Sequence, residues 1–182
     1  MKNNYYFLLT GASKGIGKSF LELLLEKNCF VIILVRNAKE LSKYKNYKNV
    51  KIFEGDITDE KITNEIFKYI RKEKIQVKYL INNAGQRQRK NFVKITKKNL
   101  KHIFDVNFFS IFGFTQKFVK YVNNKKYNSS VVNVSSIVGS LGFDNLSGYG
   151  SSKSALDGLT KCLASEFKGK IRFNSIKPGF TK

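Results

Sequence analysis

The sequence is poor in several residue types, and each shortage excludes a class of protein. It has no tryptophan, one histidine and only two cysteines, Cys29 and Cys162, in 182 residues. Two cysteines without metal-ligand spacing exclude a disulfide-rich scaffold and a zinc module, so we expect two buried free thiols. One proline, with no repeat, linker or low-complexity tract, favours a single domain over residues 1–182.

Long hydrophobic runs are also missing. The first apolar run, Tyr5–Leu9, is too short for a secretory leader. No other run approaches the roughly 20 apolar residues that a membrane span needs. We therefore expect a cytoplasmic protein without a membrane span.

Acidic residues are scarce: 13 Asp and Glu stand against 34 Lys and Arg, a formal charge of +21. Such an excess attracts polyanions, so a polyanion-binding protein is one alternative. However, the basic residues are mostly dispersed lysines, which favours solvated helix faces over specific nucleic-acid recognition. The densest basic cluster could steer an acidic substrate and consists of Arg87, Arg89, Lys90, Lys94, Lys97, Lys98 and Lys101.

Short apolar runs alternate with segments of helical periodicity along the whole chain. This alternation predicts an α/β fold, a mostly parallel sheet with helices on both faces, in the doubly wound arrangement. Ligands of such sheets bind beyond the carboxyl ends of the strands. The expected strands are Tyr5–Thr10, Phe30–Val35, Val50–Phe53, Val77–Ile81, Ser130–Val134 and Ile171–Ile176.

A glycine-rich loop, Thr10–Gly17, follows the first expected strand. In the predicted fold this loop leads into a helix whose backbone N–H groups and positive end would hold a pyrophosphate. An ordinary strand-to-helix turn is the alternative for this motif alone. We assign to cofactor binding Gly11, Ser13, Lys14, Gly15, Ile16 and Gly17.

The end of the second expected strand indicates which dinucleotide binds. A carboxylate there would accept from a ribose 2′-hydroxyl, whereas a basic residue would hold a 2′-phosphate. The strand ends in Val35 and Arg36 without a carboxylate, and Lys14 adds a second positive charge. We therefore expect NADP rather than NAD, with a merely solvated Arg36 as the alternative. Asp56 and Ile57 would contact the adenine, unless Asp56 caps a helix.

Tyr149 and Lys153 are four residues apart and would share one helix face. A free tyrosine has a pKa of about 10, and one cation about 4 Å away supplies the roughly 4 kcal/mol that lowers it by three units. Tyr149 would then act as a general acid or base. Ser136 would donate a hydrogen bond to the substrate oxygen as that oxygen gains charge. A chance pairing and a plain strand-end turn are the alternatives.

Together these motifs resemble the short-chain dehydrogenase/reductase family. The resemblance rests on Thr10–Gly17, Asn82-Asn83-Ala84-Gly85, Asn107, Ser136, Tyr149-x-x-x-Lys153 and Pro178-Gly179. It implies a Rossmann fold and an NAD(P)-dependent oxidoreductase that interconverts a carbonyl and a secondary alcohol, usually as a homodimer or homotetramer. It further implies that Asn107 joins a proton relay, and that the cofactor contacts Asn83, Ala84, Gly85, Tyr149, Lys153, Pro178 and Gly179.

The chain departs from the family pattern after Pro178-Gly179. Family members continue through a substrate-covering segment and one more strand, whereas this sequence ends at Lys182. From this we expect a weak or inactive enzyme that still binds nucleotide, with its sixth strand left as an exposed apolar edge. The leading hypothesis is reduction of a ketone or 3-oxoacyl thioester. The alternative is a non-catalytic dinucleotide-binding remnant or cofactor sensor.

Two expected helices, Asn99–Tyr121 and Gly150–Phe167, carry more apolar side chains than one buried stripe requires. Such an excess predicts association of copies through these helices. The side chains concerned are Phe108, Phe109, Phe112, Phe114 and Phe118 in the first helix and Leu156, Leu159 and Leu163 in the second.

Overall fold

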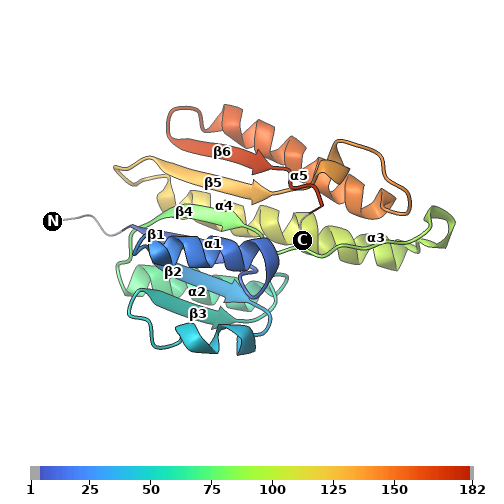
Figure 1. Cartoon of the computed structure of the whole chain (residues 1–182). Coiled ribbons are helices and arrows are strands. Elements are labelled where there is room, and N and C mark those ends of the chain that lie inside the picture. Colours follow the sequence, from blue (N-terminus) through green and yellow to red (C-terminus); the bar gives the residue numbers. More distant parts are fainter. Residues whose placement is uncertain (1–4, 181–182) are drawn as a thin grey trace.

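The computed structural model describes residues 5–180; the expectations for the first four residues and for Lys182 fall outside them. Six parallel strands form one sheet in the order β3-β2-β1-β4-β5-β6 (Figure 1). All six expected strands are confirmed, each within one residue of its predicted ends. Their bounds are β1 Tyr6–Thr10, β2 Phe30–Val35, β3 Val50–Glu54, β4 Val77–Asn82, β5 Ser129–Val134 and β6 Ile171–Ile176.

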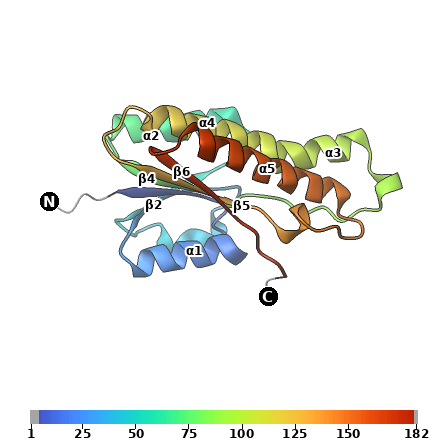
Figure 2. The ribbon, with the colours of Figure 1, turned by 90° about the horizontal axis from the view of Figure 1, so that it is seen from above.

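Helices cover both faces of this sheet. Figure 2 shows α1 on one face and α2, α4 and α5 on the other. The strand order turns round between β1 and β4, so the predicted doubly wound fold is confirmed, with its switch point at that pair. The helices are α1 Gly15–Glu26, α2 Glu60–Lys72, α3 Lys97–Phe104, α4 Ser110–Val122 and α5 Ser147–Glu166.

The core consists of two layers, one on each face of the sheet. Neighbouring strand residues point to opposite faces, so Leu8 belongs to one layer and Leu9 to the other. The layer with Leu8 also contains Phe114 and Phe118 of α4. The layer with Leu9 contains Leu21 of α1. Because both faces are covered, β2 is apolar throughout and β1 is apolar up to Thr10.

One nearly continuous helical stretch runs from Lys97 to Val122. Thr96 caps its start by accepting from the backbone N–H of Asn99 at 3.2 Å. A π-helical turn, Asp105–Phe109, joins α3 to α4. The apolar side chains point several ways, as expected: some are buried in the core, whereas Phe109 is 57% and Phe112 is 43% exposed.

Strand β6 lies at an edge of the sheet, but its expected apolar exposure is mostly wrong. Ile171 and Phe173 are buried and belong to the core layer that α4 and α5 cover. Arg172 and Asn174, which alternate with them, are exposed. Of the apolar residues of this strand, only Ile176 is exposed.

Both cysteines are free thiols, as expected, but the prediction that both are buried is wrong. Cys29 is half-buried after α1, whereas Cys162 is exposed. Lys161 and Cys162 are both exposed, because they lie on the side of α5 that faces away from the sheet.

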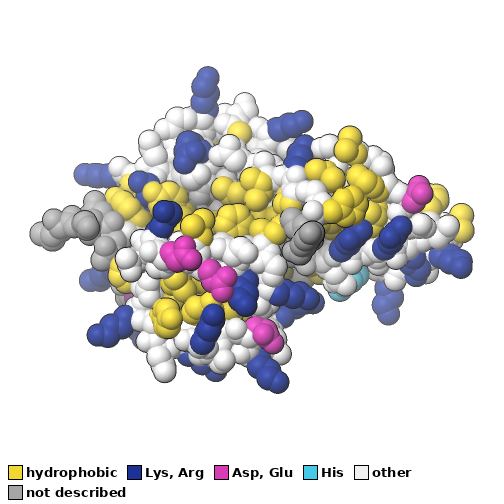
Figure 3. Space-filling view, viewed as in Figure 1, with side chains coloured by type: hydrophobic (Ala, Val, Ile, Leu, Met, Phe, Trp, Pro, Cys, Tyr) yellow, Lys and Arg dark blue, Asp and Glu magenta, His cyan; other side chains and the backbone are white. Residues whose placement is uncertain are grey.

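Charged side chains do not gather into a single stripe on the face in Figure 3, where the lysines and arginines are dispersed. Three ion pairs occur within residues 5–180, and each includes a lysine. No helix in that range is long and apolar enough to cross a membrane. The same range holds no cluster of histidine, cysteine or carboxylate side chains suited to a metal ion.

Candidate functional site

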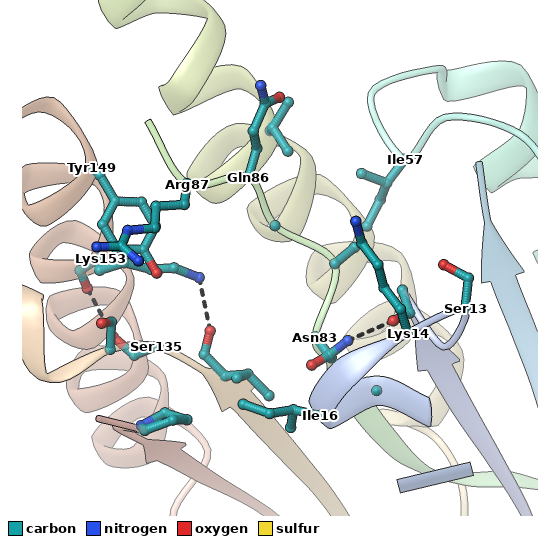
Figure 4. A pocket seen from close by; sticks show the side chains of 18 of the residues that line it. Ser13, Lys14, Ile16, Ile57, Asn83, Gln86, Arg87, Ser135, Tyr149 and Lys153 are labelled. Carbon is teal, nitrogen blue, oxygen red and sulfur yellow. Dashed lines mark hydrogen bonds between the residues drawn. The ribbon is translucent and has the colours of Figure 1, made fainter. Parts of the chain in front are cut away.

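A cavity of about 410 Å³ opens beyond the carboxyl ends of β1, β4 and β5, at the switch point of the sheet. Of the predicted site residues, all but Gly15 and Asn107 line it. Figure 4 shows Ser13, Lys14 and Asn83 at one end, and Tyr149 and Lys153 at the other. The predicted residues that line the cavity are Gly11, Ser13, Lys14, Ile16, Gly17, Arg36, Asp56, Ile57, Asn83, Ala84, Gly85, Ser136, Tyr149, Lys153, Pro178 and Gly179.

The glycine loop packs backbone against backbone. Gly11 has a φ of +72°, and a Cβ atom there would lie 2.8 Å from Ala84 Cα. A Cβ atom on Gly17 would lie 2.1 Å from the Gly11 carbonyl oxygen. Both positions therefore require glycine. Gly15, with a φ of +54°, is exposed and shapes the turn without lining the cavity.

Hydrogen bonds tie this loop to the segment after β4. The Asn83 side-chain amide donates to the Gly11 carbonyl oxygen at 2.8 Å (Figure 4). The Thr10 hydroxyl oxygen accepts from the backbone N–H groups of Asn83 and Ala84, both at 3.0 Å. The two halves of the sheet are thereby joined where the cavity opens.

The start of α1 is available to an anion. Lys14 is its N-cap residue and makes no side-chain capping bond, and no acidic residue occupies the first turn. The first backbone N–H groups of a helix lack partners inside the helix and carry the positive end of its dipole. These groups, beside a cradle that a Cβ atom would fill at Gly11 or Gly17, fit the pyrophosphate of a dinucleotide.

The polar residues after β2 and β3 lie at this same end. Arg36 is exposed and lines the cavity, and no side chain of residues 5–180 is hydrogen-bonded to it. Asp56 also lines the cavity and accepts from the backbone N–H of Thr58 at 2.9 Å and from its hydroxyl at 2.8 Å. Partial burial opposes ionisation of Asp56, but these two bonds, together with the charges of Arg36 and His102, hold its pKa below the usual carboxyl value.

The alternative of a helix cap at Asp56 is wrong. Helix α2 begins later, and its N-cap is Asp59, whose carboxylate accepts from the backbone N–H of Lys61 at 2.8 Å. Asp56 is therefore free to face the cavity.

Tyr149 and Lys153 lie one turn apart on α5, as their spacing predicts. The Lys153 Nζ atom is 5.9 Å from the centre of the Tyr149 ring. Lys153 is 4% exposed and donates to the Val134 carbonyl oxygen at 2.8 Å. Burial lowers the pKa of Lys153 to about 8, and the nearby Asp157 carboxylate partly opposes that shift. A buried cation is thus held next to a phenol at the mouth of β5.

Ser136 follows β5 at the wall of the cavity and is 8% exposed. Its hydroxyl oxygen accepts from the backbone N–H of Val138 at 3.2 Å, so the strand-end turn is present. A hydroxyl that accepts one bond still has its own proton to donate. The turn and a substrate contact are therefore compatible.

Asn107 lies behind the cavity, fully buried in the π-helical turn. Its side-chain oxygen accepts from Gln86 N at 2.8 Å, and its amide donates to Gln86 O at 2.9 Å. The same amide donates to the Ser152 hydroxyl at 3.1 Å. Asn107 therefore connects the segment after β4 to the helix that carries Tyr149.

Residues 6–182 match the short chain dehydrogenase family. The chain belongs to this family. Its members act on CH–OH and carbonyl groups, and the chain is accordingly an oxidoreductase with a dinucleotide cofactor.

Similar proteins include reductases and dehydrogenases. The 3-oxoacyl-[acyl-carrier-protein] reductase FabG of Thermotoga maritima is 33% identical, over 95% of this chain and 72% of that protein. A structure of 4-hydroxyisoleucine dehydrogenase complexed with NADH is 31% identical with a TM-score of 0.92, over 98% and 74% of the two chains. The structure of ElxO with NADP bound is 30% identical with a TM-score of 0.90, over 98% and 75%.

Several residues that line or support the cavity were not predicted from the sequence, and three of them form hydrogen bonds there. Gln86 and Ser135 line the cavity, and Thr10 holds the segment after β4. Thr10 had a usable signal, because a small hydroxyl residue at a strand end is well placed to accept from neighbouring backbone. Gln86 and Ser135 had no such signal, because their partners, His102 and the Lys153 carbonyl oxygen, are distant in the sequence.

Proposed function

We propose that the chain reduces a carbonyl compound to a secondary alcohol with NADPH, that Tyr149 is the acid/base, and that residues 1–182 act as one nucleotide-binding domain. The buried ammonium of Lys153 beside Tyr149, in the same cavity as the glycine loop, carries this proposal. A tyrosine needs such a neighbour to exchange a proton near neutral pH.

The cofactor would lie along the cavity from the glycine loop to Lys153. The backbone of Gly11–Gly17, with Ser13, Lys14 and Ile16, would hold the pyrophosphate, and Asp56 and Ile57 would contact the adenine. The nicotinamide half would be positioned by Asn83, Ala84, Gly85, Pro178 and Gly179. A bound reduced nicotinamide supplies the hydride that adds to the carbonyl carbon.

The residues of the chain would supply the proton and stabilise the charge. The Tyr149 hydroxyl gives its proton to the substrate oxygen, and Lys153 stabilises the phenolate that remains. Ser136 donates a hydrogen bond to the same oxygen. Asn107 would order the groups through which Tyr149 is reprotonated, since it links Gln86 to Ser152.

Replacement of Tyr149 by phenylalanine tests this mechanism. Tyr149→Phe removes the proton donor and leaves the cavity wall, so kcat for ketone reduction should fall roughly 10²- to 10⁴-fold. The dissociation constant of NADPH, measured by fluorescence titration, should change little. Activity retained in this variant would reject the role of Tyr149. A wild-type protein that binds NADPH but reduces no ketone or 3-oxoacyl thioester would instead favour a non-catalytic nucleotide-binding protein.

The preference for NADP rests on Arg36 and Lys14, which are both exposed and line the cavity. Structures of relatives contain NADP in one case and NADH in another, so membership of the family does not decide the cofactor. We therefore base the preference on these two local charges. Each charge-assisted hydrogen bond to a 2′-phosphate would contribute roughly 1.5–3 kcal/mol. Arg36→Asp should therefore narrow or invert the ratio of NADH to NADPH dissociation constants. Equal constants in the wild-type protein would contradict the preference.

Association of copies would use the exposed phenylalanines of the α3–α4 stretch, Phe109 and Phe112. Large exposed rings side by side on one helix are typical of an interface. Light scattering should give the mass of a homodimer or homotetramer, and Phe109→Ser with Phe112→Ser should lower it. A monomeric mass for the wild-type protein would reject this part of the proposal.

A further inference from the structure

An arginine, Arg87, lines the cavity near Tyr149. Figure 4 shows Arg87 at the end of the cavity that holds Tyr149 and Lys153, away from the glycine loop. The Arg87 side chain is exposed and forms no hydrogen bond or ion pair with residues 5–180. Its guanidinium carries five N–H donors and a permanent charge, which are thus available to a ligand.

The backbone around Arg87 is anchored on both sides. The preceding residue, Gln86, exchanges two hydrogen bonds with Asn107, at 2.8 and 2.9 Å. Three residues after Arg87, the backbone N–H of Lys90 donates to Asn145 O at 2.7 Å. Since the segment is tied at both ends, the fold holds Arg87 at the cavity rather than leaving it on a free loop.

The two residues that follow Arg87 lie elsewhere. Gln88 lies toward α5, where a Cβ atom on Gly148 would be 3.7 Å from its side-chain oxygen. Arg89 is exposed and does not line the cavity. Arg87 is therefore the one residue of the basic cluster, within the described part of the chain, that faces the cavity.

The charge balance at this end is one-sided. The lining residues of the described chain include one carboxylate, Asp56, and it lies close enough to Arg36 for that charge to lower its pKa. Near Tyr149 the charged lining residues are Arg87 and Lys153, both cationic. Lys153 already donates to the Val134 carbonyl oxygen, whereas Arg87 has no hydrogen-bond partner among residues 5–180.

We propose that Arg87 selects oxo acids, by pairing its guanidinium with a carboxylate that the substrate carries a few carbons from the reacting carbonyl. This inference rests on the proposed reductase function and names its substrate class. A planar guanidinium binds a carboxylate through two parallel hydrogen bonds. A neutral ketone or thioester leaves this cation without a partner.

Matched acids and neutral derivatives test the inference. The probes are acetoacetate and 4-oxopentanoate, their methyl esters, and the N-acetylcysteamine thioester of acetoacetate, each reduced with NADPH. We expect kcat/KM to be higher for an acid than for its ester and its thioester. Arg87→Gln should reduce kcat/KM for the acids roughly 10- to 100-fold, because it removes charge-assisted hydrogen bonds to the carboxylate. It should change kcat/KM for the esters much less.

Arg89→Gln is the matched control, because it removes the same charge two residues away and outside the cavity. It should leave the ratio of acid to ester close to the wild-type value. An equal change in both variants would assign the preference to the general positive field and overturn the inference. A wild-type preference for the ester or the thioester would overturn it as well. So would a loss of NADPH affinity in Arg87→Gln that is as large as its loss of kcat/KM for the acids.

A binding measurement separates this inference from the proposed function. Succinate, which cannot be reduced, is titrated by calorimetry into the complex with NADPH. Weaker binding to Arg87→Gln than to Arg89→Gln supports the inference even if the protein reduces no ketone. Equal binding to the two variants, or no binding to the wild-type protein, overturns the inference and leaves the role of Tyr149 to be judged by Tyr149→Phe.

Discussion

The two ends of the cavity are built by different means. At the glycine-loop end the contacts are between backbone atoms, so close that a Cβ atom on Gly17 would lie 2.1 Å from a carbonyl oxygen. The charged side chains of that end, Lys14 and Arg36, are exposed. At the other end two of the reacting side chains are enclosed, since Lys153 is 4% and Ser136 is 8% exposed, whereas Arg87 is exposed.

This difference indicates where each end tolerates change. At the glycine-loop end, the exposed positions Lys14 and Arg36 should accept other side chains, which could change the cofactor preference. The close backbone contacts of this end should not accept an added atom. At the Tyr149 end, Lys153 and Ser136 should accept few changes of side chain, because both are buried and each has a hydrogen-bond partner to lose.

The largest effect is expected where the backbone contacts are closest. Gly17→Ala places a methyl group against the Gly11 carbonyl and the Asn83 amide, so it should destabilise the fold by at least about 3 kcal/mol and abolish NADPH binding. The matched control is Gly113→Ala in α4, whose Cβ would have no atom within 4 Å. That variant should be stabilised by about 0.5–1 kcal/mol, since alanine favours helix. Urea unfolding measures both. Similar stabilities of the two variants would show that the contact at Gly17 relaxes easily.

The second effect concerns the buried charge of Lys153 and depends on pH. Its pKa is about 8 when folded and 10.5 when free, so the unfolded chain holds more protons between those values. The free energy of unfolding should therefore rise with pH through this window, by about 3 kcal/mol in total from this group. Below pH 8 the full penalty for burying the charge is present.

Lys153→Met isolates this contribution, because methionine is similar in length and does not titrate. The unfolding free energy of the wild-type protein minus that of the variant should increase from pH 7 to pH 10.5. The variant should also lose ketone reduction. A difference that stays flat with pH would mean that water reaches the ammonium, and that the two ends of the cavity are less different than their side-chain burial indicates.

Much of the fold could be predicted because the responsible patterns are local. Six apolar runs predicted six strands, and the four-residue spacing of Tyr149 and Lys153 predicted a shared helix face. The glycine loop was also recognisable, since its glycines follow a strand directly.

The remainder depends on contacts between distant residues. The burial of Ile171 and Phe173 depends on which side α5 covers, and the exposure of Cys162 on which side of α5 faces outward. Arg87 belonged to a basic cluster in the sequence, and its place at the cavity, next to the anchor between Gln86 and Asn107, distinguishes it from Arg89. Sequence periodicity shows which residues share one face of a helix or strand. It does not show which other element packs against that face.

The smallest effect is expected at Thr10, whose hydroxyl helps to hold the glycine-loop end of the cavity. Thr10→Val keeps the shape but removes the oxygen that accepts from the backbone N–H groups of Asn83 and Ala84, 73 and 74 residues away. The variant should lose about 1–2 kcal/mol of stability and bind NADPH more weakly. Thr10→Ser keeps the oxygen and should retain most of the binding. If valine and serine behaved alike, the hydroxyl would not matter, and this end of the cavity would be held by backbone contacts and the Asn83 amide.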